Sequence, residues 1–321
     1  MQTTGIATER LAANADGIRR AAALLGQGGL VAFPTETVYG LGADARNATA
    51  VARIYEAKGR PTFNPLIVHL PSLEAAREIA IFNDTAERLA ASFWPGALTL
   101  VLPLRPAHGL SSLVTAGLSS VALRVPGLEL ARDLLVRAKC PVAAPSANPS
   151  GRLSPTSAAH VLAGLDGRIE AVLDNGPAAV GVESSIVGLV GAPTLLRPGG
   201  VPVEALQACL GARLVQSADA VPASTPTAPG QLASHYAPRA PVRLNATEAG
   251  PGERLLGFGP GNGAPNLSPA GDLREAAANL FTCLHRLDLE NDAPIAVAPI
   301  PETGLGRAIN DRLRRAAAPR A

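Results

Sequence analysis

Short apolar segments alternate with helical patterns along residues 1–210, and proline, glycine or polar residues separate them. Residues 30–33 form an apolar run that Pro34 stops, which predicts a strand, whereas residues 47–57 carry apolar side chains at a helical spacing. This mixed order predicts an α/β fold, in which helices surround a twisted mixed sheet. Further strands are expected at residues 66–70, 97–102, 121–125, 142–144, 171–174 and 185–190.

Helix starts carry recognisable signals. Ser72 is expected to cap a helix that runs to residue 79, and Asp84 followed by Glu87 resembles a capping box. Further helices are expected at residues 129–137, 157–162 and 203–210.

Residues 217–241 have a different composition, because alanine, serine, threonine and proline dominate and there is no apolar stripe. Such a segment predicts an extended linker. Beyond it, strand patterns at 255–259 and 295–298 alternate with helical patterns at 273–287 and 305–317. We therefore expect an α/β domain at 1–216, a linker at 217–241 that contributes to the site, and a smaller C-terminal, Rossmann-like α/β domain at 242–321.

The charge balance does not indicate a polyanion-coating surface, since 28 basic and 26 acidic residues leave a formal net charge of +2. Aromatic residues make up 3% of the chain, whereas single-stranded nucleic acid is bound by basic and aromatic side chains together. The three cysteines lie far apart and suit reduced thiols. No apolar run reaches the roughly 20 residues of a membrane-crossing helix. We expect a cytoplasmic protein without membrane contact.

The most informative segment is 33–42, FPTETVYGLG, in which a strand stops at a proline before a group of polar side chains. Thr35, Glu36 and Thr37 can point into a cleft, and Gly40 and Gly42 permit close backbone approach. A polar turn over a buried tyrosine explains the same segment. The residues alone leave both interpretations open.

Two cations follow a predicted helix in the segment Lys58-Gly59-Arg60-Pro61. They can form a compact anion-binding corner for a triphosphate, or they can complement the negative end of the helix dipole. Lys58 and Lys139 are the only lysines among the 28 basic residues. A lysine in such a chain can mark a position that needs a compact ammonium group.

Arg124 interrupts the apolar run at 121–125, and a buried guanidinium needs an anion beside it. A ligand carboxylate and an internal Asp or Glu are equally good partners. Ser146 and Asn148 leave another strand two residues apart, so they point to one side if the chain stays extended. Glu183-Ser184 and Arg197 lie at further strand ends.

Several common catalytic motifs are absent from the sequence. There is no GxxxxGK[ST] phosphate loop, no GxSxG elbow and no zinc-ligand spacing, and the glycine-rich turn at 257–261 lacks the GxGxxG pattern. These absences argue against a P-loop NTPase and a serine hydrolase.

Seven motifs in order carry a resemblance to a known family. They are PTETVYGLG, KGRP with NPLIVH, PGALTLVL, LRVP, APSANPSG, ESSIV and LLRPGG. Over residues 16–210 the chain resembles the YrdC-like family of L-threonylcarbamoyladenylate synthases. Residues 229–231, 235–238 and 304–312 resemble the longer branch of that family, which has a C-terminal domain.

The resemblance implies a concave, positively charged cleft that binds L-threonine and ATP. Lys58 and Arg60 are implied as the catalytic cations that face the phosphates. The implied threonine-binding residues are Thr37, His69, Arg124, Ala144 through its backbone, and Ser184. The implied ATP-binding residues are Arg60, Asn64, Ser120, Ser146, Asn148, Ser154, Arg197 and Tyr236.

The implied reaction joins L-threonine, bicarbonate and ATP to give L-threonylcarbamoyl-AMP and pyrophosphate. The product would supply proteins that modify position 37 of tRNA. Mg²⁺ is expected as the counter-ion of ATP, with no metal ligands assigned to the protein. The competing hypotheses are an α/β module that binds RNA without catalysis and a carbamoyltransferase that uses carbamoyl phosphate.

Overall fold

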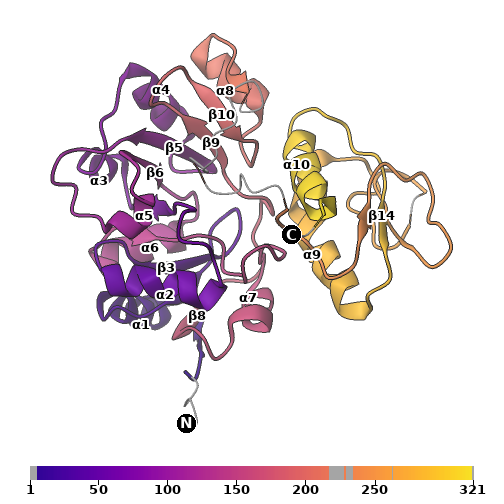
Figure 1. Ribbon diagram of the computed structural model, residues 1–321, viewed down its shortest axis with the longest axis horizontal. Coiled ribbons are helices and arrows are strands. Elements are labelled where there is room, and N and C mark those ends of the chain that lie inside the picture. Colours follow the sequence, from indigo (N-terminus) through magenta and orange to yellow (C-terminus); the bar gives the residue numbers. More distant parts are fainter. Residues whose placement is uncertain (1–5, 217–227, 229–233, 262, 320–321) are drawn as a thin grey trace.

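The computed structural model describes residues 6–216, 228, 234–261 and 263–319. It contains a large sheet and a small sheet, built from separate parts of the chain (Figure 1). The predicted mixed α/β fold is confirmed. Of the predicted linker, the structure describes Ala228 and residues 234–241, so the motif at 229–231 lies outside the described residues.

The large sheet is mixed, and its strand order is β1-β8-β2-β3-β7-β4-β6-β5-β9-β10-β11. Strands β4 and β6 are parallel, with His69 paired to Arg124, and β7 runs antiparallel to β4. The strands are β1 (Glu9–Ala12), β2 (Val31–Phe33), β3 (Gly40–Asp44), β4 (Ile67–His69), β5 (Leu98–Pro103), β6 (Ser120–Arg124), β7 (Val142–Ala143), β8 (Ala171–Asp174), β9 (Ser185–Gly188), β10 (Thr194–Arg197) and β11 (Val215–Gln216).

Helices cover both faces of this sheet. Helices α1 and α6 pack over Val31, Phe33 and Leu173, whereas the larger core on the opposite face contains Ala32 and Val172. The split follows from the alternation of side chains along each strand. The helices are α1 (Ala15–Gly26), α2 (Ala48–Lys58), α3 (Leu73–Arg77), α4 (Asp84–Phe93), α5 (Ser112–Thr115), α6 (Glu129–Ala138), α7 (Ala158–Leu165) and α8 (Val203–Leu210).

Two local predictions need correction. Asn83 caps α4, since its side chain accepts a hydrogen bond from the Ala86 amide, and Asp84 is the first helical residue. Gly40 and Gly42 do not belong to a loop but to β3, which pairs antiparallel with β2. A Cβ on Gly42 would lie 2.9 Å from both the Phe33 ring and Val142, so this position must stay small for packing within the sheet.

The smaller sheet is parallel, with the order β12-β14-β13. Helices α9 and α10 lie between it and the large domain (Figure 1). Its core also includes Val38, Leu153 and Val182, so the two parts of the chain share an apolar interface. The elements are β12 (Val242–Arg243), β13 (Arg254–Leu256), α9 (Leu273–Glu290), β14 (Ile295–Val297) and α10 (Gly306–Ala317). Among the described residues, no helix has the length and apolar character to span a membrane.

Candidate active site

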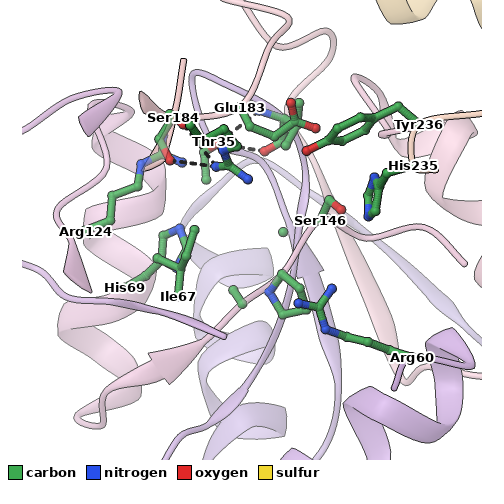
Figure 2. A pocket seen from close by; sticks show the side chains of 15 residues that line it. Thr35, Arg60, Ile67, His69, Arg124, Ser146, Glu183, Ser184, His235 and Tyr236 are labelled. Carbon is green, nitrogen blue, oxygen red and sulfur yellow. Dashed lines mark hydrogen bonds between the residues drawn. The ribbon is translucent and has the colours of Figure 1, made fainter. Parts of the chain in front are cut away.

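A cavity of about 50 Å³ lies at the ends of β4 and β6, where His69 and Arg124 line it (Figure 2). Arg124 and His69 lie on one side of it, and Arg60, His235 and Tyr236 on the other. The described lining residues are Thr35, Val38, Gly40, Arg60, Ile67, His69, Arg124, Ala144, Pro145, Ser146, Glu183, Ser184, Arg197, His235 and Tyr236.

The sheet wall of the cavity consists of Ile67, His69 and Arg124. Ile67 and His69 are two residues apart on β4, so both point to the cavity face, while Val68 between them packs into the opposite core. Burial, together with the nearby Arg124 charge, lowers the pKa of His69 to about 3. His69 is therefore neutral at pH 7, and its Nδ1 atom is buried without a partner among the described residues.

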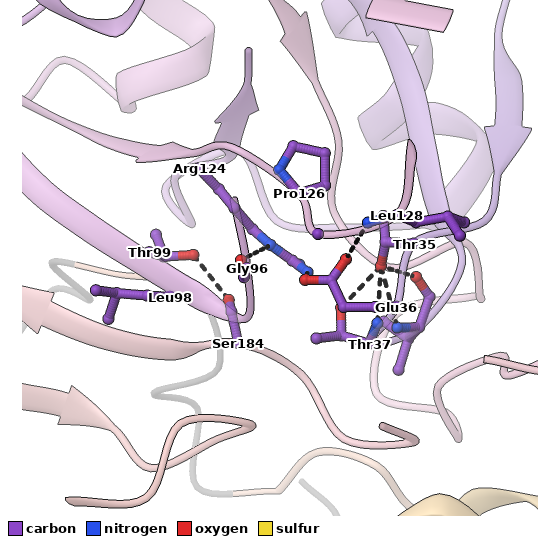
Figure 3. A network of polar contacts seen from close by, with 12 residues as sticks. Thr35, Glu36, Thr37, Gly96, Leu98, Thr99, Arg124, Pro126, Leu128 and Ser184 are labelled. Carbon is purple, nitrogen blue, oxygen red and sulfur yellow. Dashed lines mark hydrogen bonds and ion pairs between the residues drawn. The ribbon is translucent and has the colours of Figure 1, made fainter. Parts of the chain in front are cut away.

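Arg124 meets an internal carboxylate, one of the two partners that the sequence left open (Figure 3). Its Nη2 atom donates to Glu36 Oε1 at 2.6 Å, and its Nε atom donates to the Gly96 carbonyl at 3.3 Å. Burial acts to raise the pKa of Glu36, but the Arg124 charge and hydrogen bonds outweigh it and lower that pKa. Glu36 is thus an anion that orients Arg124 while Arg124 still lines the cavity.

The two threonines of the segment after β2 have different positions. Thr35 lines the cavity, and its hydroxyl donates to the Val38 carbonyl at 2.7 Å. Thr37 is fully buried behind it, with the two hydroxyl oxygens 2.8 Å apart. The predicted residue, Thr37, is therefore not among the lining residues but contacts one of them, Thr35.

Ser184 and Arg197 also line the cavity. The Ser184 hydroxyl lies 2.7 Å from the Thr99 hydroxyl, and Arg197 donates from Nη2 to the Ser184 carbonyl at 3.0 Å. Burial lowers the pKa of Arg197, but the guanidinium pKa starts so high that the side chain stays charged.

Arg60 comes from the turn after α2, where Gly59 adopts a left-handed conformation at φ 59° and ends the helix. Its Nη2 atom donates to the Pro65 carbonyl at 3.0 Å. Burial lowers the pKa of Arg60 to about 10, so it remains a cation at pH 7. The adjacent Asn64 is fully buried, and both polar atoms of its side chain are without partners among the described residues.

Lys58 does not line the cavity. Its Nζ atom is buried and donates to the carbonyls of Ser146, at 2.6 Å, and Asn148. Burial and the Arg60 charge lower the pKa of Lys58 well below its usual range. These contacts hold the segment that carries Ser146 against α2, and the role of Lys58 at the phosphates stays a prediction.

The linker wall consists of Glu183, His235 and Tyr236, two of them from the segment before β12. The His235 and Tyr236 rings are 4.1 Å apart, and the Ala237 amide donates to the Gly151 carbonyl at 2.8 Å. Burial and the surrounding arginine charges lower the pKa of His235 to about 3. Glu183 accepts a hydrogen bond from the Ser154 hydroxyl. The predicted residue Ser154 thus contacts a residue that lines the cavity.

The predicted residues that gather at the cavity are Arg60, His69, Arg124, Ala144, Ser146, Ser184, Arg197 and Tyr236. Those outside its described lining are Thr37, Lys58, Asn64, Ser120, Asn148 and Ser154. Ser120 begins β6 and Arg124 ends it, so about 13 Å of strand separates them. The substrate-binding set that the resemblance implied does not include Thr35, Glu183 or His235, although each lies within one or two residues of a member of that set.

The chain is similar to known proteins along nearly its whole length. Residues 23–199 match the family described as telomere recombination, which groups Sua5, YciO and YrdC, and residues 201–318 match threonylcarbamoyl-AMP synthase, C-terminal domain. The threonylcarbamoyl-AMP synthase of Bacillus subtilis is 41% identical over 97% of this chain and 95% of its own length. The crystal structure of Pyrococcus abyssi Sua5 complexed with L-threonine covers 98% of both chains, with a TM-score of 0.88 and 39% identity.

The fold and the arginine-lined cavity therefore define an enzyme of the nucleotidyl-transferring class, which makes an AMP intermediate. The chain belongs to the threonylcarbamoyl-AMP synthase family, in the branch with a C-terminal domain.

Proposed function

We propose that this chain uses L-threonine, bicarbonate and ATP as substrates. The threonine amine attacks the bicarbonate carbon, water leaves, and a carbamate results. A carbamate oxygen then attacks the α-phosphorus of ATP, the bond to the β-phosphate oxygen breaks, and pyrophosphate leaves. The products are L-threonylcarbamoyl-AMP and pyrophosphate, and no protein nucleophile takes part.

One observation supports this proposal most directly. Arg60, Arg124 and Arg197 line a single cavity together with the hydroxyl groups of Ser146 and Ser184. Several cations around one small cavity suit a polyphosphate beside a carboxylate. Catalysis then consists of holding the reactants in line and stabilising charge on the phosphates.

We assign L-threonine to the sheet wall. Arg124, already oriented by Glu36, is the candidate for the threonine carboxylate. Neutral His69 offers a buried nitrogen without a partner among the described residues, and Ser184 offers a hydroxyl. Thr37 and the Ala144 backbone complete the proposed set.

We assign ATP to the opposite side, where Arg60 and Tyr236 lie. The unpartnered amide of Asn64 is a further candidate, because buried polar groups normally have hydrogen-bond partners. Ser146, Asn148, Ser154, Arg197 and Ser120 complete the proposed ATP set, and Lys58 acts through Ser146.

Mg²⁺ enters as part of the substrate, as Mg-ATP. Among the described residues there is no group of three or more His, Cys, Asp or Glu side chains that could hold a metal ion. Glu183, the one carboxylate among the described lining residues of the cavity, is already engaged by Ser154 and Arg312. We therefore propose that phosphate oxygens and water supply the Mg²⁺ ligands.

The three-part organisation remains a proposal: a catalytic domain at 1–216, a linker at 217–241 and a C-terminal domain at 242–321. We further propose that the enzyme works in the cytoplasm, in keeping with its free thiols, and passes its product to proteins that modify position 37 of tRNA.

Pyrophosphate release from ATP tests the function. We expect release that requires threonine and bicarbonate together, with L-threonylcarbamoyl-AMP detected by mass spectrometry. Consumption of carbamoyl phosphate instead would indicate a carbamoyltransferase. RNA binding without pyrophosphate release would favour the non-catalytic hypothesis.

A further inference from the structure

Arg312 is the most deeply buried charged residue of the C-terminal part, and it points out of that part toward the large domain. It lies on α10 with its side chain 1% exposed. Another arginine of the same helix, Arg314, pairs with Glu302 in an exposed ion pair. Burial of a guanidinium costs folding free energy unless ion pairs and hydrogen bonds compensate it. Two of the three nitrogens of Arg312, Nε and Nη1, have such partners, whereas Nη2 has none among the described residues.

Arg312 spans the interface between the two domains. Its Nε atom donates to Glu183 Oε2 at 2.6 Å, and its Nη1 atom donates to the Pro198 carbonyl at 3.0 Å and to Asp311 Oδ2 at 2.6 Å. The other oxygen of Glu183 accepts from Ser154. Both oxygens of this cavity-lining carboxylate are thus engaged, which fixes its orientation.

The same guanidinium supports Tyr236. The Arg312 Cζ atom lies 5.1 Å from the centroid of the Tyr236 ring, and Phe281 of α9 packs against that ring at 5.8 Å. Tyr236 has φ 62°, a left-handed conformation that a bulky residue adopts only where its surroundings hold it. The His235 amide also donates to the Arg315 carbonyl of α10 at 3.2 Å. The C-terminal domain therefore contacts all three residues of the linker wall.

We propose that Arg312 is a positioning residue for the active site: α10 uses it to neutralise and orient Glu183 and to hold Tyr236 over the nucleotide side of the cavity. This inference rests on the proposed function, because it takes that side to bind ATP. Without Arg312, Glu183 would lose its ion pair and keep only the Arg197 charge and the Ser154 hydrogen bond, so more of its negative charge would face the phosphates. Tyr236 would lose a ring contact. Threonine, assigned to the opposite wall at Arg124, would be little affected.

The test compares variants of the full chain by steady-state pyrophosphate release and by calorimetric binding of each substrate. For Arg312→Met we expect the KM for ATP to rise on the order of 10–100-fold, while the KM for threonine stays within about 3-fold. Arg314→Met, on the same helix but in an exposed ion pair, is the matched control and should behave as the unaltered chain. Equal rises for both substrates, or no change, would overturn the proposal.

A second variant separates positioning from folding. Adding Glu183→Gln to Arg312→Met removes the uncompensated charge, so we expect part of the ATP affinity to return. Thermal unfolding of every variant is measured first, and Arg312→Lys, which keeps the charge, replaces the methionine variant if that one fails to fold. A double variant weaker in ATP binding than Arg312→Met would count against the proposed role.

The pH dependence gives a readout that a purely structural role would not move. Glu183 faces Arg312 from α10, Arg197 from β10, Ser154, and Tyr236 and His235 from the linker segment. In Arg312→Met we expect the KM for ATP to fall as the pH is lowered from 7.5 to 6, because protonation of Glu183 removes its charge. This fall should exceed any change of the KM in the unaltered chain over the same pH range. A parallel profile would contradict the inference.

The outcome separates this inference from the proposed function. If the unaltered chain binds neither threonine nor ATP, the proposed function fails. If it binds both and Arg312→Met is indistinguishable from it, only the role of Arg312 fails.

Discussion

The two walls of the cavity are built in different ways. The sheet wall of Ile67, His69 and Arg124 comes from paired strands, whose ladder of hydrogen bonds fixes the direction in which each side chain leaves the backbone. The linker wall of Glu183, His235 and Tyr236 depends on side chains that meet across the domain interface. Backbone pairing within one sheet positions the residues of the sheet wall. The residues of the linker wall are instead positioned by side-chain contacts with the C-terminal domain.

Substitution of Arg124 should have the largest effect, because it removes the cation of the sheet wall. For Arg124→Ala we expect the KM for threonine to rise about 100-fold, while ATP binding persists. Calorimetric titration of each substrate measures the two affinities separately. Arg77→Ala, which removes an exposed arginine paired with Glu87, is the control. Equal loss of both affinities would remove the distinction between the walls.

Substitution of Tyr236 tests the linker wall in the opposite sense. Tyr236→Ala should raise the KM for ATP by about 10-fold and leave that for threonine nearly unchanged, because a ring beside a nucleotide contributes about 1–3 kcal/mol. Tyr236→Phe keeps the ring contact with Arg312 and should retain most of the activity. If the phenylalanine variant is as weak as the alanine variant, the hydroxyl and not the ring is the important group.

Lys58 lies behind the cavity, so its substitution should have a smaller effect on either substrate. Arginine is too large for a site closed by the carbonyls of Ser146 and Asn148, and overpacking of this kind costs about 1–3 kcal/mol. We expect Lys58→Arg to lower both kcat and the melting temperature. Lys139→Arg, at an exposed helix end, is the control. Full activity and stability of Lys58→Arg would mean that the site does not require a compact ammonium group.

The smallest expected effect concerns the domain interface, where the rings of His160 and His285 stack 3.9 Å apart. Burial lowers the pKa of His285 to about 4, below the value of about 6.5 expected in the unfolded chain. The unfolded state therefore binds more protons at acid pH. The contribution of neutral His285 to the free energy of unfolding is therefore fully present above about pH 6.5, and it is lost as the pH drops toward 4.

The variant His285→Gln, which keeps a donor for the Ser154 carbonyl, should reduce this acid sensitivity. Between pH 7 and pH 5 we expect it to lose about 1–2 kcal/mol less than the unaltered chain, as measured by urea unfolding at each pH. His108→Gln, in a loop away from the interface, is the control. Identical pH profiles for the two variants would show that the histidine pair does not couple stability to pH.

Much of the fold was predictable from residue patterns. The strand patterns at 30–33, 66–70 and 121–125 correspond to β2, β4 and β6, because strand alternation and proline stops act over a few residues. The patterns did not predict α1, β1 or β3. In β3 the two glycines indicated a loop, whereas contact with Phe33 and Val142 is the reason that they are small.

The sequence by itself determined which polar side chains lie at strand ends. Most of the site residues that the family resemblance implied line one cavity in the structure. Only the tertiary structure decided the partner of each charge. Arg124 pairs with Glu36 across 88 residues, and Arg312 pairs with Glu183 across 129. A buried charge needs an opposite charge within a few ångströms, and local spacing along the chain contains no information about which distant residue folding brings there.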